Sequence, residues 1–297
     1  MPFEFDPVTI LDAVLAGILA GTVYALMGTG LSLIFGVLDI IDVAQAGYVI
    51  LAAYLSFFLQ QSLHLDLFLG LLITIPLLFL LGIVVEVVFI RPIKRDRTQL
   101  SILVTFGIGL VIEGVLGVFF GTTERELDAW YVTQGIKIGN FYVAYVYIFA
   151  FIMAVVLIVV LFVLLYRTKF GRSVRALMQN RTAAQLIGIN VERVSAITFA
   201  IGAALTAAGG MAYGATTPFN PNSWYDLITR LFAIIILGGL GSVQGALIGG
   251  IIMLVAFDVT AVVWSPVWSS AVFFAALVLL LLFRPQGLFG SLATRKQ

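Results

Sequence analysis

Apolar stretches of about 20 residues, each long enough to cross a bilayer as a helix, recur along the whole chain of 297 residues. The chain is 62% hydrophobic and only 10% charged, whereas soluble domains carry about 25% charged residues. So few charges cannot cover a water-facing surface. The sequence therefore predicts an all-α, polytopic transmembrane helix bundle that forms a single transmembrane domain over residues 1–297, located in the cell membrane.

We expect eight to nine membrane segments. The seventh is short and ends in the glycine-rich run GGLGSVQG, so it is either a full crossing or a re-entrant, broken piece. The expected segments are Val8–Val37, Val43–Gln60, Leu67–Ile90, Gln99–Gly121, Phe141–Tyr166, Val194–Ala215, Leu227–Leu240, Val243–Val263 and Trp268–Phe283.

The distribution of Lys and Arg predicts the orientation, because loops rich in these residues stay in the cytoplasm. Nine crossings with the N-terminus outside place 13 of the 16 basic residues on the cytoplasmic side, in the loop 91–97, the segment 167–193 and the C-terminal tail. The acidic N-terminus and the loop Thr122–Asn140 then face outward. Eight crossings break this agreement at the tail unless one segment is re-entrant.

Several classes of function are disfavoured by what the sequence lacks. Cysteine is absent and His64 is the only histidine, so no metal cluster or Cys- or His-based catalytic set is expected. No phosphate-binding loop of the form G-x-x-x-x-G-K-[ST] occurs, so the chain is not expected to hydrolyse nucleotides. The basic residues have no interleaved aromatic platform for nucleic acid. We therefore expect a non-enzyme without a cofactor.

The segment Arg167–Arg193 carries six of the 16 basic residues between two apolar stretches. Its spacing favours a short amphipathic helix, with Val174, Leu177, Met178 and Leu186 on the apolar face and Arg172, Arg175 and Arg181 beside it. Gly171 and Gly188 would permit sharp turns at its two ends. Such a helix suits a groove on a partner protein, and the alternative is a basic loop held against anionic membrane lipid.

Charged residues within the expected spans are candidate functional residues, because a charge at membrane depth is costly. Glu113 either lines a translocation path or forms a structural ion pair with Arg230. Glu86 lies one turn before Arg91 and is expected to snorkel or cap the helix end, and Asp258 lies near the outer end of its span.

Two Gly-interrupted segments lie near opposite ends of the chain, at 28–47 and 233–250. Each is a span, a polar break and another span, a pattern that points to inverted repeats around a midplane site. The candidate path residues in these breaks are Asp42, Gln45, Gly239 and Gly241. For the first break, the alternative is a turn at the membrane face.

Four motifs in sequence order resemble the branched-chain amino acid ABC transporter permeases, over essentially the whole chain. They are YALMGTGLSLIFGVLDIIDVAQAGYVILAAY, GRSVRALMQNRTAAQLIGIN with the span after it, ILGGLGSVQGALIGG and LLFRPQGLFG. In the first motif Gln45 stands where the family typically has a histidine.

This resemblance implies one permease subunit of an ATP-driven importer for branched-chain or other hydrophobic amino acids in the inner membrane. The implied partners are a sister permease subunit, two cytoplasmic ABC ATPase subunits and an extracytoplasmic substrate-binding protein. The segment 167–193 would be the cytoplasmic coupling segment. Its ATPase-coupling residues would be Gly171, Arg172, Arg175, Ala176, Asn180, Ala184, Gly188 and Ile189. The alternatives are a permease for urea or short amides and a secondary carrier working alone; a membrane-embedded enzyme is a further rival.

Overall fold

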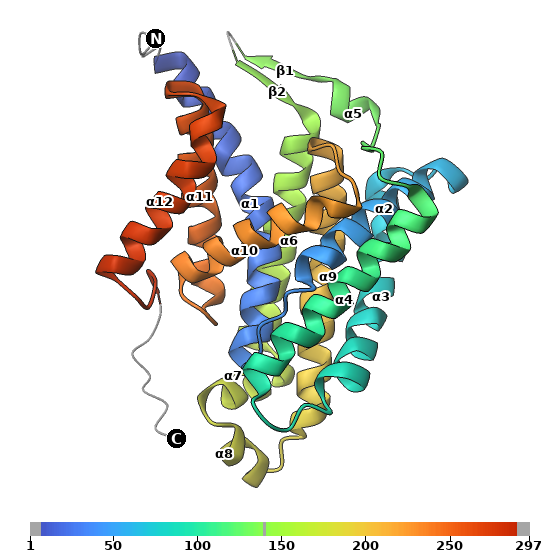
Figure 1. Ribbon diagram of the computed structural model, residues 1–297, viewed down its shortest axis with the longest axis vertical. Coiled ribbons are helices and arrows are strands. Elements are labelled where there is room, and N and C mark those ends of the chain that lie inside the picture. The colour runs from blue at the N-terminus through green and yellow to red at the C-terminus, as the bar shows by residue number, and fades with distance from the viewer. Residues whose placement is uncertain (1–6, 139–140, 290–297) are drawn as a thin grey trace.

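The long apolar stretches of the sequence form a bundle of helices in the computed structural model, which describes residues 7–138 and 141–289 (Figure 1). Within these residues, eight helices are long and apolar enough to cross a membrane. Their bounds are α1 (Pro7–Leu38), α2 (Gln45–Leu63), α3 (Leu67–Val85, continued by the π-helix η1, Glu86–Ile90), α4 (Arg97–Phe120), α6 (Tyr145–Arg167), α9 (Val191–Thr216), α11 (Val243–Val263) and α12 (Pro266–Phe283). The expected polytopic bundle is confirmed.

The expected seventh segment is the helix α10 (Trp224–Gly238), which has 15 residues and follows the 3-10 turn η2 (Pro221–Ser223). At about 1.5 Å per residue it is shorter than the hydrocarbon core of a bilayer. It runs obliquely across the bundle in Figure 1 and ends at a glycine turn before α11. Eight long helices and one short oblique helix thus account for the expected count.

One expected span begins later than its apolar residues indicated. Phe141–Ala144 forms the strand β2, which pairs antiparallel with β1 (Gly135–Ile138), and α6 begins only at Tyr145. This hairpin follows the short helix α5 (Trp130–Thr133). The Phe141–Tyr166 prediction was therefore wrong in its first four residues, because a strand can be as apolar as the start of a membrane helix.

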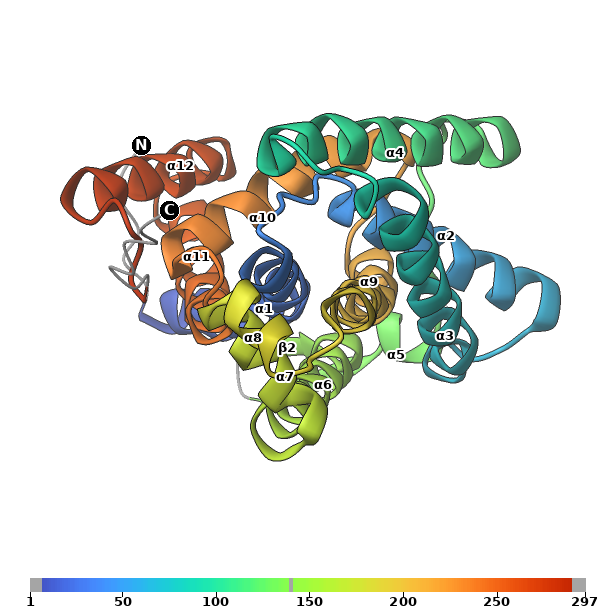
Figure 2. The same cartoon turned by 90° about the horizontal axis from the view of Figure 1, so that it is seen from below.

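Small residues let α1 and α11 approach closely. A Cβ on Gly17 would lie 2.6 Å from the Cα of Val255, and one on Gly21 would lie 2.9 Å from that of Ile251. Helices in lipid associate through such close packing, because lipid tails supply no hydrophobic drive between them. Seen from below in Figure 2, α1 and α9 lie near the middle of the bundle, inside a ring that includes α2, α4, α6 and α11. The contact between α1 and α11 is therefore built on glycines, while large aromatic side chains such as Trp224, Tyr48 and Phe199 are fully buried elsewhere in the bundle.

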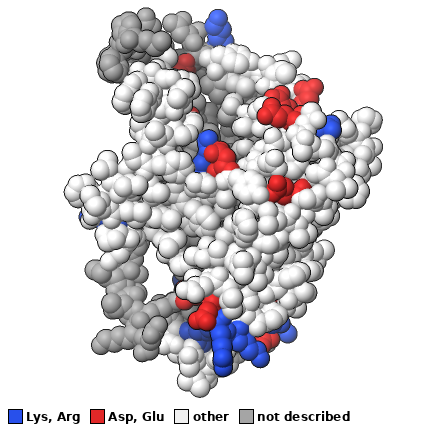
Figure 3. Space-filling view, viewed as in Figure 1, with Lys and Arg blue, Asp and Glu red and all other residues white. Residues whose placement is uncertain are grey.

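The two basic loops meet at one end of the bundle. Arg91, after η1, forms an ion pair with Glu192 at the start of α9, so the loop 91–97 lies beside the end of the 167–193 segment. Lys and Arg side chains gather at this end, the lower one in Figure 3. At the opposite end, the backbone of Arg125 pairs with that of Phe219. The structure thus places both loops at one end; which side of the membrane that end faces stays a prediction.

Candidate functional site

The segment 167–193 forms two helices, α7 (Lys169–Gln179) and α8 (Arg181–Leu186), and not the single amphipathic helix that its spacing favoured. The helix is interrupted at Asn180, whose side-chain oxygen accepts a hydrogen bond of 2.9 Å from the backbone N–H of Ala183. An asparagine favours such an N-terminal cap over the interior of a helix, because its short side chain satisfies a free backbone donor.

The helix α7 is held tightly against the end of α6. Thr168 caps α7 by accepting a hydrogen bond of 3.0 Å from the N–H of Gly171. A Cβ on Gly171 would collide with the carbonyl oxygens of Leu164 and Leu165. The predicted role of Gly171 as a sharp turn was wrong: it lies inside α7, at a contact too close for any side chain.

Two buried side chains and Arg175 also hold α7 in place. Val174 and Leu177 are buried in the core cluster. Arg175 donates through Nη1 to the carbonyl oxygen of Leu165, and its guanidinium lies over the ring of Tyr166, 5.1 Å from the ring centroid. Arg175 is therefore engaged with α6, whereas Arg172 is exposed. Ala176 is half-buried on the same helix.

The helix α8 presents an apolar tip to solvent. Leu186 is 83% exposed and Ile187 is 75% exposed, while Ala184 is buried beneath them. Leu186 therefore does not share one apolar face with Val174 and Leu177, because the helix is interrupted at Asn180 and α8 turns away from the line of α7. Gly188 has a φ of 85° with open space around it, which fits the turn expected there. Ile189 is half-buried.

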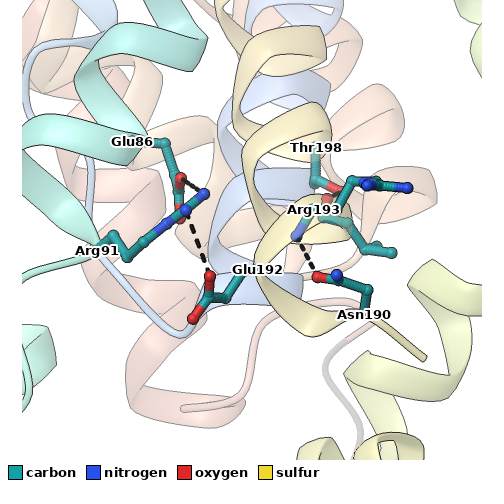
Figure 4. A network of polar contacts seen from close by, with 7 residues as sticks. Glu86, Arg91, Asn190, Glu192, Arg193 and Thr198 are labelled. Carbon is teal, nitrogen blue, oxygen red and sulfur yellow. Dashed lines mark hydrogen bonds and ion pairs between the residues drawn. The ribbon is translucent and has the colours of Figure 1, made fainter. Parts of the chain in front are cut away.

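A three-residue ionic network fastens the end of this segment to the third span (Figure 4). Glu86 is only 1% exposed, and its Oε2 lies 2.9 Å from Nη2 of Arg91. Nη1 of the same arginine lies 3.4 Å from Oε2 of Glu192. Glu86 was expected to snorkel or cap a helix end, and that was wrong: it is buried and paired. The contact with Glu192 joins residues 101 positions apart, which sequence spacing did not indicate.

Asp42 and Gln45 lie in the core of the bundle and line none of the cavities described below. Both are fully buried. Asp42 Oδ1 accepts from the N–H of Ala44 at 3.1 Å, and Gln45 Nε2 donates to the carbonyl of Gly202 at 3.2 Å. Burial raises the pKa of Asp42, in the connection between α1 and α2, to about 7. Their assignment to a translocation path stays a prediction.

The other candidate path residues are separated from one another. Glu113 accepts a hydrogen bond of 2.8 Å from Nε1 of Trp224, so the alternative of an ion pair between Glu113 and Arg230 is wrong. Arg230 instead pairs with Asp226 one turn earlier, at 2.9 Å. Gly239 and Gly241 have φ angles of 101° and 80° and form the turn between α10 and α11.

A cavity of about 620 Å³ opens in the half of the bundle opposite to α7 and α8. Figure 3 shows a hollow there, above a Lys or Arg side chain that touches an acidic one. Three charged residues line the cavity, Asp12 of α1, Arg230 of α10 and Asp258 of α11. The sequence marked Asp258 and Arg230 as charges within spans, but it did not indicate that they share a cavity with Asp12.

The comparisons identify the class of protein that this bundle belongs to. Residues 13–282 match the family model described as "Branched-chain amino acid transport system / permease component", and the chain belongs to this family. The family is a transport permease component and not an enzyme class.

Individual relatives agree over nearly the whole chain. They include the high-affinity branched-chain amino acid transport system permease protein BraD of Pseudomonas aeruginosa, 26% identical over 94% of this chain and 95% of the relative. The LivH permease proteins of that system in Salmonella typhimurium and Escherichia coli are 28% and 27% identical over the same shares. No solved structure matches the chain.

Proposed function

We propose that this chain is one permease subunit of an ATP-driven importer that carries branched-chain or other hydrophobic amino acids across the inner membrane. It would pair with a sister permease, receive substrate from an extracytoplasmic binding protein and be driven by two cytoplasmic ATPase subunits. The observation that carries this proposal is the exposed apolar tip of α8, Leu186 and Ile187, on a helix pair anchored to a bundle of this family.

The tip has the chemistry of a docking surface for a protein partner. Burying a large aliphatic side chain fully stabilises a complex by about 1.5–3 kcal/mol. Leu186 is the last residue of α8 and Ile187 follows it, at the basic end of the molecule, where no lipid tail would cover them if this end faces the cytoplasm. Arg172 is exposed on the neighbouring helix and supplies a polar rim.

The anchor makes this surface suitable for transmitting force. Gly171 and Arg175 fix α7 to the end of α6, and the pair Arg91–Glu192 fixes the start of α9. A push on α8 therefore acts on two spans, α6 and α9. We assign the predicted coupling residues to two roles: Gly171, Arg175, Ala176 and Ala184 anchor the segment, and Arg172, Asn180, Gly188 and Ile189 shape the surface around the tip.

The test is a double substitution of the tip, Leu186→Asp with Ile187→Asp. We expect the ATPase subunits to dissociate during purification and ATP-dependent leucine uptake into vesicles to fall about tenfold or more, since each lost apolar contact is worth at least about one factor of ten. Leu186→Met keeps the apolar surface and should retain uptake. Undiminished uptake by the chain without any ATPase would refute the proposal in favour of a secondary carrier.

The side of the membrane is tested by cysteine labelling, because the chain has no cysteine of its own. Gln185→Cys, on exposed α8, should react with a membrane-impermeant maleimide only from the cytoplasm. Glu124→Cys, exposed at the opposite end, should react only from outside. Reversed labelling of the two positions would overturn the proposed orientation.

A further inference from the structure

We propose that the cavity bounded by Asp12, Arg230 and Asp258 binds a free aliphatic amino acid as its zwitterion. Arg230 would hold the carboxylate, and Asp258 and Asp12 would hold the ammonium group. This inference rests on the proposed function and deepens it, because it locates the substrate within one permease chain, in the half of the bundle remote from α7 and α8.

Arg230 is oriented to receive an anion. Its Nε lies 2.9 Å from Oδ2 of Asp226, and its guanidinium carbon lies over the ring of Phe257, 4.8 Å from the ring centroid. These two contacts fix the plane of the guanidinium. Its Nη1 and Nη2 atoms form no hydrogen bond within residues 7–138 and 141–289, although the side chain is only 22% exposed. A guanidinium with two free parallel donors matches the two oxygens of a carboxylate.

The two carboxylates have free acceptor oxygens. Asp12 and Asp258 each form no ion pair with any residue that the structure describes, and both are half-buried in the cavity wall. Asp258 directly follows Phe257, on which Arg230 lies, and the charges of Asp258 and Arg230 interact. A half-buried carboxylate without a cationic partner is costly to remove from water. An ammonium group would compensate these carboxylates where no protein cation does so fully.

The rest of the cavity suits an aliphatic side chain. Its wall includes Ala13, Ala16 and Ala20 of α1 and Leu254 and Val262 of α11. The volume of about 620 Å³ lies within the usual range of small-molecule sites, about 300–1,000 Å³. One cation, two anions and an apolar wall are the complement of a zwitterion with a hydrocarbon chain. An amine or a fatty acid alone would leave part of this set unused.

A zwitterionic lipid headgroup offers the same two charges, so the test separates the two sources. Binding is measured on the full-length chain in nanodiscs with radiolabelled leucine. The competitors are leucinamide, which lacks the carboxylate, 4-methylpentanoate, which lacks the ammonium, and glycerophosphoethanolamine, which is the headgroup without its acyl chains.

The proposal predicts a reciprocal pattern. Arg230→Gln should lower the affinity for leucine and for 4-methylpentanoate about tenfold or more, as expected for a lost charge-assisted hydrogen bond. The affinity for leucinamide should not change. Asp258→Asn should lower the affinity for leucine and for leucinamide and leave the affinity for 4-methylpentanoate unchanged. Retained binding of one ligand shows that the variant is folded. Glu124→Gln removes an exposed charge elsewhere at this end and should change none of the three.

Three results would overturn the inference: no leucine binding by the wild-type chain, equal losses for all three ligands, or competition by glycerophosphoethanolamine alone. Uptake assays keep its failure apart from that of the proposed function. If the complete importer carries leucine with an unchanged apparent KM after Arg230→Gln, the site is wrong and the transport function stands. If the wild-type importer shows no ATP-dependent uptake, the proposed function itself fails.

Discussion

Replacing Arg91 by glutamine tests whether the ionic network beside the coupling segment stabilises the bundle. Glu86 is 1% exposed and its carboxylate lies 2.9 Å from Arg91, which is 34% exposed. Removing one partner of a fully buried pair costs about 3–5 kcal/mol, because the remaining charge is buried without compensation. Since water reaches about a third of Arg91, we expect a smaller loss for Arg91→Gln, about 2–3 kcal/mol of the free energy of unfolding.

The same network supplies the matched controls. Glu192 is 72% exposed and lies 3.4 Å from Arg91, so Glu192→Gln should cost less than about 1 kcal/mol, as exposed ion pairs do. Adding Glu86→Gln to Arg91→Gln should recover most of the loss, because a neutral amide is far less costly to bury than a carboxylate.

Equilibrium unfolding in mixed detergent micelles measures these differences, with helicity as the readout. A loss for Arg91→Gln no larger than that for Glu192→Gln would refute the reasoning, since burial of Glu86 would then carry no energetic weight. The reasoning would also fail if the double variant were no more stable than Arg91→Gln alone.

Three further predictions follow from other contacts. Gly17→Val should lower the free energy of unfolding by about 1–3 kcal/mol, because the added side chain pushes α1 away from Val255 of α11. Gly117→Val should have little effect in the same unfolding assay, because a Cβ there has no described neighbour within 4 Å. Asp42 holds a proton in the folded state up to a pKa of about 7, against 3.8 ordinarily, so stability should fall as pH rises between these values, and thermal unfolding of Asp42→Asn should lack this dependence. Gly188→Val should strain the left-handed turn after α8 and uncouple ATP hydrolysis from uptake, whereas Gly188→Asn, which tolerates this backbone conformation, should retain coupled uptake.

Hydropathy predicted the spans well because length and apolarity are local properties. The segments Leu67–Ile90 and Val243–Val263 coincide with α3 plus η1 and with α11. The error at Phe141–Ala144 has a local cause too, since its apolar residues carry no mark that distinguishes a strand from a helix start. The spacing of glycines alone does not indicate helix contact: Gly17 and Gly21 face α11, but Gly117 and Gly121, at the same spacing, meet no described atom of this chain within 4 Å.

The site was only partly predictable. The polar segment 167–193 stood out by composition. Its division into two helices depended on whether Asn180 caps a new helix or continues the preceding one, which spacing does not decide. The ionic partners depended on geometry that spacing does not contain. Arg230 pairs with Asp226 four residues away, and Glu113 accepts a hydrogen bond from the indole of Trp224. The charged residues of the cavity come from α1, α10 and α11, so only the fold brings them together.

The packing also determines how the walls of that cavity are connected. A Cβ on Gly249 would lie 2.7 Å from the carbonyl oxygen of Ile234, and Gly17 meets Val255 as closely, so α1, α10 and α11 are locked together at their contacts. This group carries Asp12, Arg230 and Asp258. The facing wall contains Tyr147 of α6 and Thr216 of α9. These are the two spans to which α7 and α8 are anchored at the other end. The span α9 also packs closely on α1, since a Cβ on Gly202 would lie 3.0 Å from the carbonyl oxygen of Gly30, so under our proposal a force applied at α8 would reach the charged wall through α9 as well.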